Sequence, residues 1–118
     1  MADENTVLCL NPDGQTLRNH ESALRESGFE VMSVSSPLQA RFEIEMGRCG
    51  IFLSGYITPL PIYRSLVGLF RRSCPEGLVI LVTHQHDASV PEADALLFSD
   101  DEPQAVVRWI VSKARKAG

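Results

Sequence analysis

Five short apolar runs alternate with segments of helical periodicity, and this alternation restricts the fold more than any other feature of the chain. Residues 6–10 (TVLCL) and 78–82 (LVILV) are continuously apolar, which is typical of parallel strands buried on both faces. Strands separated by helices form parallel sheets through right-handed crossovers, which place helices on both faces. The predicted strands are residues 6–10, 29–34, 51–53, 78–82 and 95–98.

Turn and capping residues mark where the helices between these strands begin and end. The first helix is predicted over residues 15–27, with Gly28 as its C-terminal stop. Ser36 and Pro37 are the N-cap and the first residue of a second helix, which ends at Gly47. Apolar stripes at helical spacing run along the second and third helices. The stripes are Leu38, Phe42 and Met46 in the second helix, and Ile62, Leu66, Leu69 and Phe70 in the third.

The segment between the fourth and fifth strands has few helical signals. Residues 84–92 (HQHDASVPE) have no apolar stripe and contain Pro91. A fourth helix is therefore expected to be shortened or lost, whereas helical spacing returns after the fifth strand. The expected fold is α/β, a flavodoxin-like, doubly wound sheet of five parallel strands in the order 2-1-3-4-5.

Several segments together resemble the receiver domain of bacterial two-component response regulators. VLCLNPDG stands where receivers have an apolar strand ending in paired acids, and IFLSGYITP stands where a strand ends in the phosphoacceptor aspartate. ESGFEV, VILVTH and EADALLFS resemble the segments that contain the second, fourth and fifth strands. The resemblance implies a single receiver-like domain over residues 1–118 that acts in signal transduction.

The residues that carry phosphoryl chemistry in receivers are mostly missing from the matching positions. A receiver needs a carboxylate that attacks phosphorus, paired acids that hold Mg²⁺ and a lysine that neutralises developing charge. The matching positions hold Asn11 and Pro12 for the acid pair, Ser54 or Gly55 for the acceptor, Thr83 for the family's hydroxyl residue and Ser99 for the lysine. The resemblance therefore implies a degenerate receiver with no enzymatic activity and no cofactor. Such a domain would act through phosphorylation-independent protein–protein contact.

Two alternatives use the same edge of the sheet, because the carboxyl ends of parallel strands meet there. A polar, uncharged pocket could bind a small ligand or anion. Its candidate residues are Asn11, Asp13, Ser54, Thr83 and Ser99. Alternatively, Asp13 and a hydroxyl acceptor could support weak Mg²⁺-dependent phosphoryl chemistry.

Each acidic residue that could bind a metal also occupies a position where an acid has a purely structural role. Asp13 lies in Asn-Pro-Asp-Gly, where a turn or helix cap uses an aspartate, and Asp100 and Asp101 precede a helix. His84 and His86 have the spacing of metal ligands, but a solvated loop accounts for them as well. We therefore predict no metal site, and Mg²⁺ binding is not expected.

Charge, hydrophobicity and cysteine content limit which partners and which cellular compartment are expected. A net charge of −4 gives no reason to expect nucleic-acid binding. The polar N-terminus is unlike a signal peptide, and no apolar run approaches the ~20 residues that cross a bilayer. Three cysteines without CxxC spacing suit reduced thiols in the cytoplasm. The expected partners are signalling proteins or a second copy, in contact with the shortened fourth-helix region and the last helix.

Overall fold

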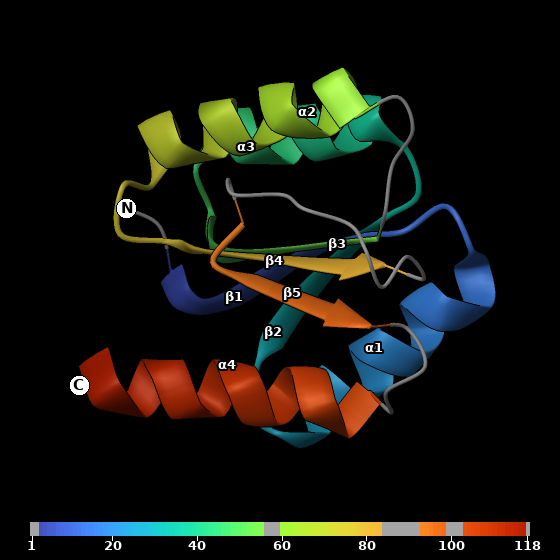
Figure 1. Ribbon diagram of the computed structural model, residues 1–118, viewed down its shortest axis with the longest axis vertical. Helices are drawn as coiled ribbons and strands as arrows, with labels where there is room; N and C mark the ends of the chain where they lie inside the picture. The colour runs from blue at the N-terminus through green and yellow to red at the C-terminus, as the bar shows by residue number, and fades with distance from the viewer. Residues whose placement is uncertain (1–2, 56–59, 84–92, 99–102, 118) are drawn as a thin grey trace.

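A parallel five-stranded sheet forms the centre of the computed structural model, which describes residues 3–55, 60–83, 93–98 and 103–117. The strands lie in the order β2-β1-β3-β4-β5, and every neighbouring pair is parallel (Figure 1). The predicted fold class is confirmed. The strands are β1 (Asp3–Leu10), β2 (Glu30–Val34), β3 (Cys49–Gly55), β4 (Leu78–Thr83) and β5 (Ala95–Phe98); the helices are α1 (Gly14–Glu26), α2 (Pro37–Met46), α3 (Leu60–Ser73) and α4 (Pro103–Ala117).

The described residues contain four helices for five strands. Of the chain between β4 and β5 the structure describes only residues 93 and 94, which are not helical. Residues 84–92, where the fourth helix was expected to be shortened or lost, lie outside the described residues. The helix after β5, which the sequence predicted as the last helix, carries the label α4. None of the described helices combines the length and the apolar character that a membrane span needs.

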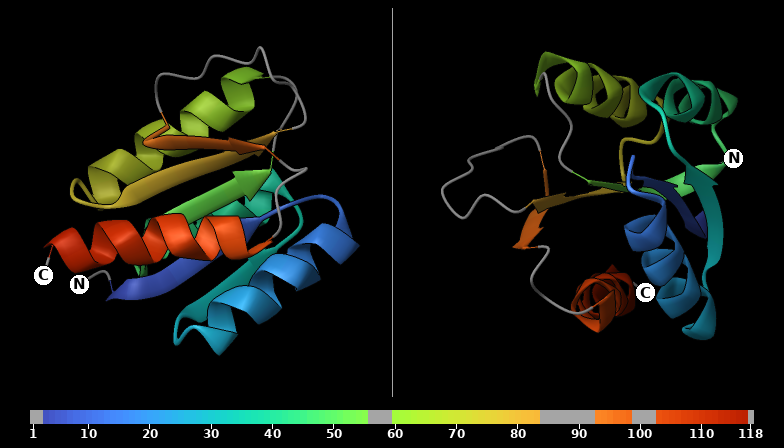
Figure 2. Two further views of the ribbon diagram at one scale, coloured as in Figure 1. Left: turned by 60° about the horizontal axis from the view of Figure 1, so that its bottom comes forward. Right: turned by 90° about the vertical axis from the view of Figure 1, so that its right-hand side faces the viewer.

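The helices cover the sheet in two layers, with α2 and α3 on one face and α1 and α4 on the other (Figure 2). Alternate strand residues point to opposite faces. Leu8, Phe52 and Leu81 accordingly belong to the core under α2 and α3, whereas Val7 and Leu53 belong to the core under α1 and α4. This alternation decides on which face each residue at the strand ends lies.

The predicted capping residues are in place. The Asp13 carboxylate accepts a hydrogen bond from Thr16 N (3.3 Å) and begins α1. Ser36 caps α2 by accepting from Gln39 N (3.3 Å), and Pro37 is the first helical residue. Gly47 ends α2 with φ of 69°, a left-handed conformation that side chains with a Cβ rarely adopt.

The third strand is longer than the prediction of residues 51–53. It extends over seven buried residues that include Ser54 and Gly55, which have low strand propensity. Because β3 lies between β1 and β4, its backbone groups find partners on both sides. Burial of these groups without partners would be costly, so the central position overrides propensity. Ser54 and Gly55 are thereby drawn into the sheet itself.

The apolar stripe of α2 faces away from the sheet. Leu38, Phe42 and Met46 are exposed, whereas Ala40 and Ile44 on the opposite side of the helix are buried. A stripe of this kind normally faces the core. Here the small Ala40 side chain and Ile44 contribute to the core under α2 and α3. The larger stripe is left on the surface. Ile62, at the start of the α3 stripe, is also exposed.

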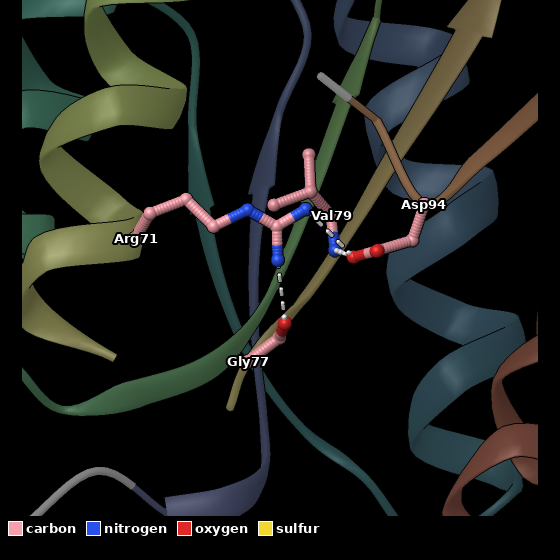
Figure 3. A network of polar contacts seen from close by, with 4 residues as sticks. All are labelled: Arg71, Gly77, Val79 and Asp94. Atoms are coloured by element: carbon pink, nitrogen blue, oxygen red, sulfur yellow. Dashed lines mark hydrogen bonds and ion pairs between the residues drawn. The ribbon is translucent and has the colours of Figure 1, made fainter. Parts of the chain in front are cut away.

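Asp94, just before the edge strand β5, forms hydrogen bonds with β4 and α3 (Figure 3). Asp94 Oδ2 accepts hydrogen bonds from Val79 N of β4 (2.8 Å) and from Arg71 Nη2 of α3 (3.0 Å). Asp94 N donates to the Val79 carbonyl oxygen (2.8 Å), and Arg71 Nη1 donates to the Gly77 carbonyl oxygen (3.1 Å). A single carboxylate thus joins α3, β4 and β5.

Candidate functional site at the carboxyl edge of the sheet

The ends of β1, β3 and β4 bring the predicted site positions to one edge of the sheet. Strand register pairs Leu10 with Ser54, so Asn11 follows β1 beside Gly55, the last residue of β3. On the other side of β3, Gly55 pairs with Val82. Thr83 ends β4 one residue further on. The structure therefore brings Asn11 and Gly55 side by side.

The side chain of Asn11 occupies the space above Gly55. A Cβ atom added at position 55 would lie 2.7 Å from Asn11 Nδ2 and 3.0 Å from Asn11 Cγ. Both separations are too short for an unshifted contact. The Asn11 side chain is buried, and its Oδ1 accepts a hydrogen bond from Asp13 N (2.9 Å). The amide of Asn11 is thus held in the turn and fills the place of a side chain at position 55.

The hydroxyl residues belong to the opposite face of the sheet. Ser54 and Thr83 continue the alternation of Phe52 and Leu81, which face α2 and α3. Both are almost completely buried. The Ser54 hydroxyl donates to the Gly55 carbonyl oxygen (2.7 Å), so it satisfies a backbone group. The alternation thus separates the two hydroxyls from the Asn11 amide.

The Asp13 carboxylate accepts hydrogen bonds at the start of α1 and acts as its N-cap. The hydrogen bonds from the Thr16 hydroxyl and the Thr16 amide lower the pKa of Asp13, and Arg18 also lowers it. Pro12 between Asn11 and Asp13 is exposed and offers no side-chain ligand. The predicted cap is therefore the role in which the structure places Asp13.

The oxygen donors found here do not fit Mg²⁺, which prefers charged oxygen ligands in an octahedron. They are the neutral Asn11 amide, whose oxygen accepts from Asp13, the buried hydroxyls of Ser54 and Thr83 on the opposite face, and one carboxylate that caps a helix. Within residues 3–55, 60–83, 93–98 and 103–117 there is no cluster of three or more metal-ligating residues. Ser99, the candidate histidines His84 and His86, and the acids Asp87, Asp100 and Asp101 lie outside the described residues.

Cys9 acts as a small apolar core residue, as predicted. It is buried under α1 and α4, and burial together with the nearby Glu21 raises the pKa of its thiol to about 12. A thiol with this pKa stays protonated and is a poor ligand or nucleophile. Cys9 therefore adds no chemistry to the site.

The contact between Asn11 and Gly55 was missed by sequence reasoning, although a signal for it existed. Parallel pairing of VLCLN with IFLSG places the asparagine beside the glycine once the register is known. Sequence alone left the acceptor position open between Ser54 and Gly55. In the structure, Ser54 faces one core, and Gly55 lies under the Asn11 amide.

We expect the substitution Gly55→Ala to lower the free energy of unfolding by about 1 kcal/mol, the size of one hydrogen bond. The new methyl group would push the Asn11 amide away from Asp13 N. Urea denaturation of Gly55→Ala, Asn11→Ala and the double variant measures the coupling. The double variant should lose less stability than the sum of the single variants. Strict additivity would contradict the contact.

Solved receiver structures share this fold over nearly the whole chain. A response regulator receiver domain protein (CheY-like) from Methanospirillum hungatei JF-1 has a TM-score of 0.82 at 20% identity, covering 97% of this chain and 96% of that chain. A response regulator protein from Burkholderia pseudomallei with a phosphorylated aspartic acid, calcium ion and citrate has a TM-score of 0.76 at 13% identity, with 98% and 71% covered. The BeF3-activated DrrB receiver domain has a TM-score of 0.74 at 18% identity, with 93% and 99% covered.

Sequence comparison alone finds no relative. No protein family model matches the chain, and no curated protein matches it either. The predicted resemblance is nevertheless confirmed at the level of structure, and the chain has the fold of response regulator receiver domains.

Proposed function

We propose that this receiver-fold domain acts in signal transduction through protein–protein contact that does not depend on phosphorylation of an aspartate. Receiver domains work in signalling pathways with protein partners, and the fold supports that general role. The proposal further assigns no enzymatic activity, no metal and no cofactor to the domain. The free cysteines Cys9, Cys49 and Cys74 suit a reducing compartment, which we propose to be the cytoplasm.

The observation that carries the proposal is the Asn11 side chain above Gly55. A phosphoacceptor aspartate at position 55 would need the space that Asn11 Nδ2 and Cγ occupy. The neighbouring position offers Ser54, whose buried hydroxyl donates to a backbone carbonyl. Neither position supplies a carboxylate, and a side chain at position 55 would require the Asn11 amide to shift.

Two of the similar solved structures contain a phosphoryl group or a mimic of one. One contains a phosphorylated aspartic acid with a calcium ion, and another is described as BeF3-activated. In this chain, the described end of β1 supplies a neutral amide, and the adjoining Asp13 carboxylate is already used by Thr16. The charge that would hold a cation and the group that would accept phosphorus are both lacking at Asn11, Ser54, Gly55 and Thr83. We therefore infer an output that relies on surface contacts.

An amide NMR titration with Mg²⁺ and then beryllofluoride tests the proposal. We expect no saturable shifts at the five candidate pocket residues, because the Asp13 carboxylate is bonded to Thr16 and the other four positions carry no carboxylate. These residues are Asn11, Asp13, Ser54, Thr83 and Ser99. A receiver that retains its acceptor aspartate, titrated in parallel, controls for the reagents. Joint, saturable shifts in this chain would overturn the phosphorylation-independent assignment.

A further inference from the structure

The outer side of α2 carries large apolar side chains that the fold leaves exposed. Leu38, Phe42 and Met46 are 77%, 59% and 52% exposed, and Ile62 of the adjacent α3 is 39% exposed. These four residues, called the α2 face below, are the large apolar side chains exposed among the described residues. All four belong to α2 and α3, the two helices that cover one face of the sheet (Figure 2). A gathered patch, unlike a scattered exposed leucine, is typical of an interaction site.

Two grooves flank the α2 face and give it a shape that can interlock. One groove of about 390 Å³ lies between α2 and α3, where Leu38, Ile62 and Ser65 are among the lining residues. A second of about 380 Å³ lies on the other side of α2, lined in part by Val34 and Phe42. Leu38 lines both grooves, so the first part of the stripe forms a ridge between them. Helices pack when the ridge of one enters the groove of another.

The charges on one flank of this ridge, Arg41 and Glu45, are self-complementary, whereas Glu43 on the other flank pairs with Arg48 of its own chain. Arg41 and Glu45 form an exposed pair one helical turn apart, with Arg41 Nε 3.1 Å from Glu45 Oε1. In an antiparallel pair of identical helices related by a twofold axis, the same flank of each helix meets its counterpart in reverse direction. Arg41 of one copy then faces Glu45 of the other, and the reverse contact forms by symmetry. A second copy of this chain therefore meets both the shape and the charge of the surface.

We propose that two copies of this chain associate through the α2 face, with their α2 helices antiparallel about an axis between residues 42 and 43, which brings Arg41 of each copy near Glu45 of the other. Phe42 then packs against its counterpart, and Leu38 of one copy lies near Met46 of the other. This inference deepens the proposed function by naming the contact surface and the partner. It rests on that function only in taking surface contact as the output.

The size of the surface predicts a weak, concentration-dependent dimer. A patch of this kind covers about 300–600 Å², less than the ~800 Å² that each partner buries in a standard interface. The charged rim of Arg41 and Glu45 must therefore contribute. We expect a dissociation constant on the order of 10 µM, in the range of transient contacts. This surface differs from the predicted contact region, which centred on the fourth-helix segment and the last helix.

Sedimentation equilibrium of the full chain, from about 1 to 500 µM, tests the dimer across its expected dissociation constant. Phe42→Glu should weaken association at least about 100-fold, because two buried glutamates would face each other at the axis. The exposed Arg108→Glu on α4 introduces the same residue away from the surface and should leave association unchanged. Circular dichroism verifies that each variant is folded, which is expected because both side chains are exposed.

Charge reversal tests the antiparallel arrangement. Arg41→Glu should weaken the dimer about 10-fold through like charges across the axis, and the double variant Arg41→Glu with Glu45→Arg should restore it. A wild-type chain that is monomeric throughout overturns the inference and directs the search to a different protein on this face. A dimer that ignores Phe42→Glu, or a double variant without rescue, also overturns it. Because beryllofluoride titration tests the strand edge separately, either proposal can fail while the other stands.

Discussion

The substitution Gly77→Ala is expected to lower the free energy of unfolding by about 3 kcal/mol, at the upper end of the usual cost of overpacking. A Cβ at Gly77 would lie 2.5 Å from Phe70 Cζ and 2.9 Å from the Gly50 carbonyl oxygen. Phe70 is buried and packs on Phe52, with ring centroids 5.9 Å apart, so the ring has little room to retreat. Urea denaturation followed by far-UV circular dichroism measures the change.

Gly68→Ala is the matched control for this substitution. Gly68 lies in α3, and a Cβ there would have no atom within 4 Å. The same change should therefore raise stability by about 0.5–1 kcal/mol, the gain in helix propensity. If Gly77→Ala proved as stable as the wild type, the tight approach of residues 50, 70 and 77 would be incorrect.

Removal of the Asp94 carboxylate is expected to cost about 2 kcal/mol, the range for hydrogen bonds to a charged group. Asp94→Ala would leave Val79 N without its 2.8 Å acceptor and would break the contact with Arg71. Since β5 has four residues and pairs only with β4 among the described strands, its amino end would loosen first. Chemical denaturation and hydrogen exchange at Val79 N measure the two effects.

Glu45→Ala provides the comparison, because its partner Arg41 and Glu45 itself are both well exposed. Loss of that pair in the monomer should change stability by at most about 0.5 kcal/mol. Asp94→Asn keeps an oxygen acceptor without the charge. Its loss in free energy of unfolding should lie between the losses for Glu45→Ala and Asp94→Ala. A loss of less than about 0.5 kcal/mol for Asp94→Ala would show that β5 is held by other contacts.

Local chemistry explains why the architecture was predictable. The continuous apolar runs identified strands with two buried faces, and Ser36 followed by Pro37 marked the start of α2 because the cap hydroxyl and the fixed proline φ act within one turn. Gly47 ended the helix for an equally local reason, its positive φ. Features decided by a few neighbouring residues could be predicted without tertiary information.

Features decided by contacts between distant segments could not. The apolar spacing of Leu38, Phe42 and Met46 is the same whether the stripe faces a core or solvent, and only the packing of Ala40 and Ile44 settles the rotation of α2. Asp94 is 15 residues from Val79 and 23 from Arg71 in sequence, so nothing local indicated its partners.

The candidate site was predictable in its location and only partly in its arrangement. The topology placed Asn11, Gly55 and Thr83 at the carboxyl edge, as the alternation of strands and helices requires. The strand alternation that sends Ser54 towards α2 and α3 depends on register, which the sequence did not specify. Ser99 lies outside the described residues, so its place at this edge stays a prediction.

The Asn11 amide has a consequence for how such a domain could change over evolutionary time. Its oxygen is bonded to Asp13 N and its nitrogen covers Gly55, so an acidic residue gained at position 55 would have to displace the Asn11 amide from that hydrogen bond. An acid gained first at position 11 would lie beside a glycine with nothing to coordinate. A change at either position therefore acts on the other, because a side chain at position 55 requires the Asn11 amide to move. The contact couples the end of β1 to the end of β3, so these two positions are expected to change together.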